Sequence, residues 1–435
     1  MGSSAARENQ YLLVFGATMA LRERAVVAAL RVFDGPVVTI ARSHDARAAK
    51  FFDHVLLGDF SDPEASLKAV VDFEKETGMT PAGVVPFFDP GLLPGRAIAD
   101  HYGLPFLSRQ AIEDSSINKN RMKDRLLAAG VATPRYITVD GLESVRAAVA
   151  ELGLPCVIKP AAFGGSLGVR LITDEADIPD AYATVRGIIT ANAATFTVKN
   201  EGIQVEEFCS LSEEVSVEVL THGERPQVLA VTDKSHGPRP YFAEIGHRVP
   251  SVHSERADVI DLAERACTAI GLDRGVAHVE LRLEGDQPPQ IMEVGARTAG
   301  DGILDLVERA LGFSPYELHI RSYLDRLDGP LPQVRPVGLA ALAVLKAPAG
   351  RIARIRPART VDAAVRSYEV FATPGAVSSG QQANYLHREG YVECFWPGAA
   401  PESVPRSAHL DVAAELATEI FEMEPVDSGL DFTRS

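Results

Sequence analysis

The chain has 435 residues, of which 46% are hydrophobic, and a formal net charge of -16. This length predicts about two to four domains, and the acidic balance without a basic face disfavours nucleic-acid binding. No apolar run reaches the roughly 18 residues of a membrane span, and residues 1–10 lack the apolar core of a signal peptide. We therefore expect a cytoplasmic protein that binds neither nucleic acid nor membrane.

The first hundred residues alternate short apolar runs with helical patterns. The runs predict strands at 11–16, 36–40, 55–59 and 83–87, and the patterns between them predict helices at 22–30 and 64–76. Strand and helix alternating across short turns predict a parallel α/β domain, which we place at residues 1–112. Gly16 lies where a dinucleotide-binding turn would lie, but the segment lacks G-x-G-x-x-G, which disfavours that function.

The middle of the chain predicts two α+β units. The first contains helices at 118–130, 142–152 and 175–190, strands at 156–160 and 169–172, and a glycine-rich loop at 161–168. Strands at 203–208 and 214–220 are expected to form a hairpin-like pair, and the second unit ends with a helix at 255–270 and strands at 277–283 and 290–295. Beyond about 330, short strands, many Gly and Pro turns and a final helix at 408–422 predict a separate small domain.

Two glutamates on consecutive predicted strands are the strongest candidates for metal ligands. Glu280 lies in HVELRL and Glu293 in QIMEVG, and the turn EGDQPP joins the two strands. Residues two apart share a face of a strand, so an antiparallel pair can place both carboxylates on one face. The carboxylates would repel without a cation, and Mg²⁺ commonly uses one or two carboxylates together with substrate phosphates. The pair predicts a magnesium site; two solvated glutamates on a hairpin are the alternative.

Three further motifs point to a phosphorylated ligand. Arg297, four residues after Glu293, offers a planar guanidinium to a phosphoryl or carboxylate oxygen. Lys159 ends a predicted strand before Gly164-Gly165-Ser166-Leu167-Gly168, where a point charge and backbone N–H groups would suit a polyphosphate. This loop is not a Walker A motif, and an ordinary hairpin turn is the alternative.

A short acidic stretch offers groups for a nucleoside. Backbone groups along Gln204-Val205-Glu206-Glu207-Phe208 can pair with an adenine, and Glu214 can accept from two ribose hydroxyls. By itself, the sequence Glu-Glu-Phe has no predictive value.

Taken together and in this order, these residues resemble the ATP-grasp superfamily over about residues 10–330. The matching positions are Lys119, Lys159, the glycine loop, Glu206, Glu207, Phe208, Glu214, Glu280, Glu293 and Arg297. The resemblance implies an α/β and α+β multidomain protein with the ATP-grasp fold. Its parts would be an N-terminal domain (1–112), a central antiparallel-sheet domain (113–132 and 213–330), a mobile lid (133–212) and a small C-terminal extension (331–435). It also implies ATP and Mg²⁺ as cofactors, with Mn²⁺ as a substitute.

Within that superfamily, the segment from Thr232 to Pro250 and the tail beyond 330 resemble the L-amino-acid ligases, which join amino acids into dipeptides. The resemblance implies that Glu244, His247 and Arg297 line the amino-acid and acyl-phosphate site and that Asp301 shapes the substrate pocket. Asp89 lies where many relatives carry an acidic residue facing the substrate. A structural histidine at 247 and a helix-capping or turn role for Asp89 are the alternatives. Homodimers are common among these relatives.

One departure from the family pattern concerns the metal. Members usually have E-x-N-x-R, whereas this chain has Glu293-Val294-Gly295-Ala296-Arg297. Gly295 supplies no side-chain oxygen, so a second Mg²⁺ would be held more weakly or completed by water. The expected activity is an ATP-dependent ligase that activates a carboxylate as an acyl phosphate and passes it to an amine, with amino acids as substrates. The alternatives are an acid–thiol ligase, a biotin-carboxylase-like enzyme, and a nucleotide-binding regulator with a degraded site.

Overall fold

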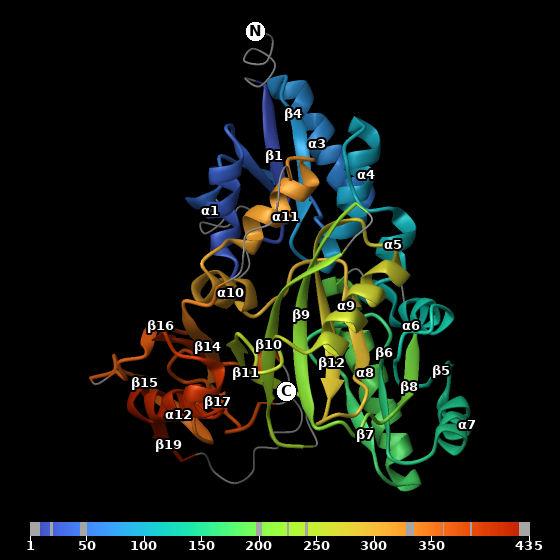
Figure 1. Ribbon diagram of the computed structural model, residues 1–435, viewed down its shortest axis with the longest axis vertical. Helices are drawn as coiled ribbons and strands as arrows, with labels where there is room; N and C mark the ends of the chain where they lie inside the picture. The colour runs from blue at the N-terminus through green and yellow to red at the C-terminus, as the bar shows by residue number, and fades with distance from the viewer. Residues whose placement is uncertain are drawn as a thin grey trace.

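The computed structural model describes residues 9–17, 21–43, 50–196, 202–223, 226–239, 242–327, 335–359, 361–382 and 385–425. These residues form four sheets. Figure 1 shows the N-terminal sheet at the top, the last hundred residues at the lower left and a smaller sheet with its helices at the lower right. Among the described residues, no helix combines the length and apolarity that a membrane crossing requires.

The N-terminal sheet is parallel, as the alternating pattern predicted. In spatial order its strands are β3 (His54–Leu57), β2 (Val37–Ala41), β1 (Gln10–Phe15) and β4 (Thr80–Pro86). Its helices are α1 (Glu23–Val32), α3 (Pro63–Thr77), α4 (Leu92–Tyr102) and α5 (Arg109–Glu113). Local sequence sets the ends of α3: the Asp62 side chain accepts from Ala65 N, and Gly78 closes the helix at φ 74°.

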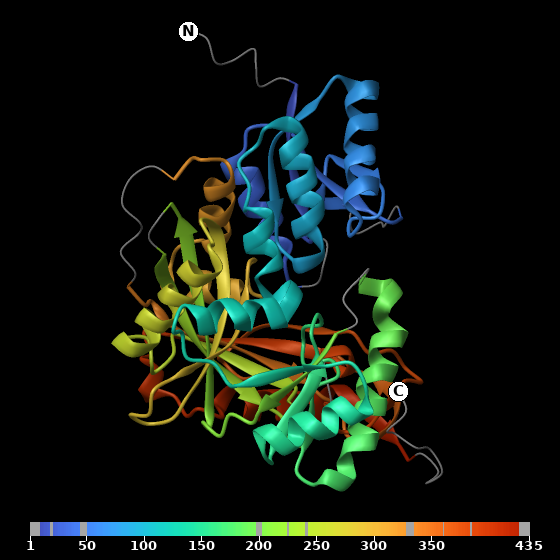
Figure 2. The same ribbon diagram turned by 90° about the vertical axis from the view of Figure 1, so that its right-hand side faces the viewer.

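The second sheet belongs to the segment predicted as the lid. Its antiparallel strands are β5 (Tyr136–Val139), β8 (Ile203–Glu207), β6 (Cys156–Pro160) and β7 (Arg170–Ile172), with helices α7 (Leu142–Leu152), η3 (Glu175–Asp177) and α8 (Ile178–Phe196). Figure 2 shows α8 running along the outer side of this unit. Val145, Ile158, Ile172, Val185 and Val205 are among the side chains of its hydrophobic core, which is distinct from the core of the large sheet.

The predicted pairing of strands 203–208 and 214–220 is wrong. β8 hydrogen-bonds to β5 on one side and β6 on the other, so it has no free edge for a further strand. The chain leaves this sheet after Glu207 and starts β9 (Glu213–His222) in the large sheet instead. The short link between β8 and β9 therefore joins two units and is not a hairpin turn.

The large sheet has eight antiparallel strands. In spatial order they are β13 (Gln290–Gly295), β12 (Arg274–Leu283), β9, β10 (Gln227–His236), β11 (Glu244–Val249), β14 (Gly338–Leu345), β18 (Gly390–Pro397) and β16 (Val365–Val370). The helices of this part of the chain are η2 (Ser116–Asn118), α6 (Lys119–Ala128), α9 (Ala257–Ile270), α10 (Ile303–Leu311) and α11 (Pro315–Tyr323). The sheet continues across residue 330 into β14, β18 and β16, while the predicted domain boundaries themselves remain predictions.

A smaller layer completes the C-terminal extension. It consists of β15 (Gly350–Ile355) between β17 (Val377–Ser378) and β19 (Phe421–Glu424), with η4 (Tyr385–His387), η5 (Pro401–Ser403) and α12 (Ala408–Ile420). Leu345, Ile352, Val392 and Ile420 are among the side chains of its core.

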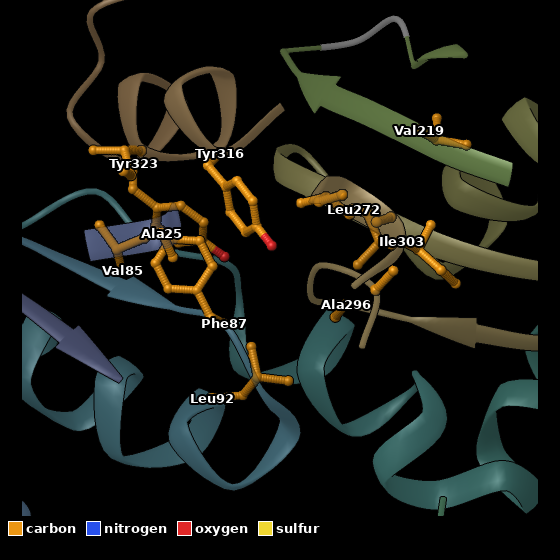
Figure 3. Close-up of a cluster of buried hydrophobic side chains, with 14 of the residues drawn as sticks. Ala25, Val85, Phe87, Leu92, Val219, Leu272, Ala296, Ile303, Tyr316 and Tyr323 are labelled. Carbon is orange, nitrogen blue, oxygen red and sulfur yellow. The ribbon is translucent and has the colours of Figure 1, made fainter. Parts of the chain in front are cut away.

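One hydrophobic core joins the N-terminal sheet to the large sheet. Figure 3 shows Phe87, just after β4, facing Tyr316 of α11, and the ring centroids are 5.9 Å apart. His319 of α11 lies between the two sheets, with Nε2 2.9 Å from Pro86 O and Nδ1 accepting from Val276 N at 2.9 Å. This packing fixes the end of β4, and with it the residues that follow Phe87, against the strands of the large sheet.

Candidate active site

A cleft lies between the lid sheet and the large sheet, and residues of both units line it. Thirteen of the predicted site residues line it: Lys119, Lys159, Gly164, Gly165, Ser166, Glu206, Glu207, Phe208, Glu214, Glu244, Glu280, Glu293 and Arg297. Asp89, His247 and Asp301 are not among its lining residues. Asp89 contacts Arg297 and His247 contacts Glu244, both of which line the cleft, and Asp301 lies beside His247.

The two predicted metal ligands lie opposite each other. Glu280 of β12 pairs directly with Glu293 of β13, as the two alternating strands predicted. Each carboxylate already contacts an ammonium group: Glu293 Oε2 lies 3.0 Å from Lys119 Nζ, and Glu280 Oε1 lies 2.8 Å from Lys234 Nζ. Burial alone would raise the pKa of Glu280, but Lys234 and a neighbouring histidine hold it well below its usual value. Both groups therefore offer charged oxygens to a divalent cation, and the donor set fits Mg²⁺.

Gly295 leaves space beside this pair. A Cβ placed there would meet its nearest neighbours, His278 O and Ser116 Oγ, at 3.6 Å, which is ordinary contact. The missing asparagine of the family pattern is therefore not a consequence of crowding. Gly295 supplies no side-chain oxygen, so Glu280 and Glu293 are the predicted side-chain ligands that would hold a Mg²⁺ here.

A histidine supports Glu280 from behind. His278 Nε2 lies 3.2 Å from Glu280 Oε1, and its Nδ1 lies 2.7 Å from Glu218 Oε1, a fully buried carboxylate. Burial alone would lower the pKa of His278, but Glu218 and Glu280 raise it to about 9. A protonated His278 bridges the two acids and fixes the orientation of Glu280.

A buried cluster of two lysines and one glutamate joins α6 to the lid sheet. Lys123 and Lys159 each place Nζ 2.8 Å from Glu206 Oε1. Burial alone would raise the pKa of Glu206, yet the two lysines lower it to about 2. Burial, together with repulsion from Lys159, lowers the pKa of Lys123 to about 8 despite its contact with Glu206. One carboxylate does not offset two ammonium groups, so the cluster has excess positive charge, which suits a phosphate.

The backbone of the glycine loop adopts positive φ angles at two consecutive residues. Gly165 has φ 64° and Ser166 has φ 59°, both in the left-handed region that favours glycine. Ser166 Oγ donates to Phe242 O at 2.8 Å, which ties the loop to the segment before β11. Exposed N–H groups along such a loop are suited to phosphate oxygens.

Lys234, to which the sequence interpretation assigned no role, contacts three carboxylates of the site. Its Nζ lies 2.8 Å from Glu244 Oε1, 2.8 Å from Glu280 Oε1 and 3.3 Å from Glu214 Oε1, and its side chain is fully buried. Burial would lower the pKa of Lys234, but the three carboxylates raise it well above its usual value. The lysine links the predicted ribose, metal and substrate residues into one network.

Glu214 also has two cationic neighbours of its own. Arg282 Nε donates to Glu214 Oε2 at 3.1 Å, and His236 Nε2 lies 3.4 Å from the same oxygen. These contacts outweigh burial and lower the pKa of Glu214, so it remains an anionic acceptor.

The predicted substrate residues form two neighbouring groups. In the first, Arg297 Nε donates to Asp89 Oδ2 at 2.9 Å, and Ser116 Oγ donates to Asp89 Oδ1 at 3.2 Å. Asp89 caps no helix with its side chain, so the capping alternative does not hold. Against the effect of burial, Arg297 lowers the pKa of Asp89, and Asp89 raises the pKa of Arg297. The two side chains therefore form an ion pair.

The second group lies at the edge of β11. His247 Nε2 is 3.6 Å from Glu244 Oε2 and 3.8 Å from Asp301 Oδ2, while its Nδ1 is buried with no hydrogen-bond partner in the part of the chain that the structure describes. Both oxygens of Asp301 accept from Arg388, at 2.6 Å each. Arg388, Lys123 and Lys234 are among the site residues that the sequence interpretation left without a role, because their partners lie on elements distant in the chain.

The chain resembles known proteins in sequence and in fold. Residues 152–305 match the ATP-grasp domain. The alanine–anticapsin ligase of Bacillus subtilis (strain 168) is 29% identical over 256 residues, which are 55% of this chain and 53% of that protein. The formate-dependent phosphoribosylglycinamide formyltransferase of Burkholderia cenocepacia (strain HI2424) is 28% identical over 317 residues, 69% of this chain and 72% of that protein.

A solved structure extends the likeness to nearly the whole fold. The L-amino acid ligase from Bacillus licheniformis superposes with a TM-score of 0.74 at 21% identity, covering 96% of this chain and 99% of that one. The chain nevertheless spans only about half the length of the alanine–anticapsin ligases that it matches in sequence. Residues 152–305 therefore form an ATP-grasp domain, and the superposition shows that nearly the whole chain has the fold of that solved structure.

Proposed function

We propose that the protein is an ATP- and Mg²⁺-dependent ligase that joins a carboxylate to an amine, with amino acids as the substrates. The observation that carries this proposal is the pairing of Glu280 with Glu293 in one cleft with Lys119 and Lys159. Acidic metal ligands and buried ammonium groups facing one cleft suit a nucleoside triphosphate, which needs both. The likeness to a ligase that joins alanine to anticapsin supports the choice of reaction.

The first step would transfer the γ-phosphoryl group of ATP to the substrate carboxylate. A carboxylate oxygen attacks the γ-phosphorus, a new O–P bond forms, and the bond to the departing ADP oxygen breaks. Mg²⁺ held by Glu280 and Glu293 would offset phosphate charge in this step. Lys119, Lys159 and Arg297 provide fixed positive charge around the transferred group, and such electrostatic positioning supplies most of the catalysis in phosphoryl transfer.

The second step would form the amide bond. The amine nitrogen attacks the acyl carbon and phosphate departs. Since an ammonium group must first lose its proton, a base must lie near the nitrogen, and Glu244 and His247 lie 3.6 Å apart at the substrate side of the cleft. Water has to be excluded from an acyl phosphate, and the lid loop tied to Phe242 through Ser166 supplies a cover.

The proposal is tested by phosphate release. Pairs of amino acids and small carboxylic acids are screened with ATP and Mg²⁺, and the product mass is measured. Formation of phosphate and an amide together supports the ligase. A thioester product would indicate the acid–thiol alternative, bicarbonate-dependent carboxylation the biotin-carboxylase-like one, and ATP binding without turnover the regulator.

Two variants of one hairpin make the metal assignment testable. Glu293→Gln removes a ligand charge at the cleft and should abolish ADP release. Asp286→Asn is the matched control, because Asp286 is exposed on the turn between β12 and β13. Wild-type turnover in Glu293→Gln would overturn the assignment. A homodimer and a cytoplasmic location remain predictions from the sequence.

A further inference from the structure

The C-terminal extension reaches the substrate side of the cleft through Arg388. Its guanidinium donates to both oxygens of Asp301 at 2.6 Å each, a parallel two-bond geometry that fixes the carboxylate in one orientation. Asp301 has φ 54°, in the left-handed region, just before the glycine that precedes α10. The side-chain exposures are 14% for Arg388 and 29% for Asp301, so both side chains are largely shielded from solvent.

Tyr385, three residues before Arg388, contacts the lid. The Tyr385 ring lies so close to Gly165 that a Cβ at position 165 would be 2.5 Å from Tyr385 Cδ1. Tyr385 also packs against the hydrophobic core of the lid. Gly165 therefore has two reasons to be glycine: its positive φ and the ring pressed against it.

Residues 385–389, which we call the strap, are short and firmly anchored. η4 makes Tyr385–His387 one turn of 3-10 helix, which rises only about 2 Å per residue. At the other end, Lys346 Nζ lies 2.6 Å from Glu389 Oε1 and donates to His387 O at 2.9 Å. Only two residues separate Tyr385 from Arg388, so a displacement of one end moves the other.

A second contact joins Gln382, which precedes the strap, to Glu244 on the substrate side of the cleft. Gln382 Nε2 donates to the backbone carbonyl of Glu244 at 2.9 Å. Gln382 Oε1 and Arg388 Nε are buried without a hydrogen-bond partner among the described residues. Buried polar atoms are normally satisfied, so these two atoms suit a polar ligand or ordered water at this edge of the cleft.

We propose that the strap couples closure of the glycine loop over the nucleotide to the position of Asp301, and that Arg388 is thereby a positioning residue of the substrate pocket. Tyr385 contacts Gly165 and the hydrophobic core of the lid, and Arg388 fixes the carboxylate of Asp301. Linkage is reciprocal, so a substrate that fits the pocket formed around Asp301 also favours the closed loop. The inference rests on the proposed function for the statement that a substrate occupies this pocket; the mechanical coupling stands on the contacts alone.

Hydrogen exchange of the full chain tests the coupling. Exchange is measured with and without Mg²⁺ and AMPPNP, a non-hydrolysable ATP analogue, at a concentration verified to saturate each variant. In the wild type, the nucleotide should slow exchange in peptides covering 163–169 and also in those covering 299–304. Tyr385→Ala and Arg388→Gln should keep the first effect and lose the second. Tyr385→Phe keeps the ring and should retain both.

A control and the opposing outcomes complete this test. Phe371→Ala alters an exposed aromatic side chain of the same extension and should retain both effects. Protection of 299–304 that persists in Tyr385→Ala and Arg388→Gln, or that never appears in the wild type, would overturn the strap. Absence of protection at 163–169 in the wild type would instead count against the nucleotide site and thus against the proposed function.

Kinetics supply a second readout, using the amino-acid pair that gives the fastest phosphate release with the wild type. Arg388→Gln and Asp301→Asn should each raise the KM for one amino acid about tenfold while changing the KM for ATP less than about twofold, a tenfold change being about 1.4 kcal/mol. The double variant should be no worse than either single one, because both remove the same interaction. Arg388→Lys should recover only part, since lysine lacks the two-pronged geometry. Equal rises in both KM values would contradict a positioning role.

Discussion

The buried contact between Lys123 and Glu206 makes a quantitative test of the lid's electrostatics possible. Lys123 has no exposed side-chain surface, and Glu206 has 2%. Lys123→Met keeps the length of the side chain and removes its charge and its bonds to Thr133 Oγ1 and Glu206. Glu206 would then retain Lys159 but lose one of its two cations.

The magnitude follows from the burial of the pair. Removing one member of a buried ion pair typically costs about 3–5 kcal/mol, because the remaining charge stays buried and less compensated. At roughly 2–4 °C per kcal/mol for a cooperative unit of 150–250 residues, the transition that includes the lid should fall by about 6–20 °C. The retained contact with Lys159 places the expectation towards the lower end.

Lys68→Met is the matched control. Lys68 also pairs with a carboxylate, that of Asp72, but its side chain is 77% exposed. Exposed ion pairs contribute little to stability, so the transition of Lys68→Met should move far less than that of Lys123→Met. Differential scanning calorimetry of both variants, without nucleotide, measures the two shifts. Shifts of equal size would refute the reasoning that burial makes the Lys123 contact different.

Two further outcomes follow from the structure. Burial raises the pKa of Asp305 to about 7, so the folded state holds this proton more tightly than the unfolded state, and the associated stability is complete below pH about 4 and lost as the pH rises towards 7. Asp305→Asn should therefore gain on the wild type in melting temperature between pH 5 and 8; parallel curves would show that Asp305 does not titrate in this range. Metal removal is the second case: with EDTA, ADP at about 100 times its dissociation constant should lose the roughly 2.7 kcal/mol by which it stabilises the fold, and Mn²⁺ should restore it. Undiminished stabilisation by ADP in EDTA would contradict a metal held by Glu280 and Glu293.

The sequence allowed the fold class and much of the local structure to be predicted. Residues 278–283 of β12 alternate between polar and apolar side chains, and a short turn joins β12 to β13, so their pairing follows from local pattern; the register shift directly after Glu280 does not. The parallel N-terminal sheet follows in the same way from alternating elements. The wrong pairing of 203–208 with 214–220 shows the limit of this reasoning, because the partners of β8 are β5 and β6, which nearness in sequence does not reveal.

Contacts between distant segments explain what was missed. Lys234 meets Glu214, Glu244 and Glu280 from three other strands, so its role depends on sheet order. β11 went unrecognised as a strand because Glu244–Val249 contains Gly246 and lacks a simple alternation. Arg388 lies far along the chain from Asp301, and no local spacing connects them.

The order of the eight strands separates two tasks along one sheet. The metal carboxylates lie at one end, on β13 and β12, whereas Glu244 and His247 lie on β11, whose next neighbour is β14 of the C-terminal extension. Through the sheet, changes within the extension would therefore reach β11 first, whereas β12 and β13 lie three and four strands beyond it; Lys234 is the shorter link, since it contacts both Glu244 and Glu280.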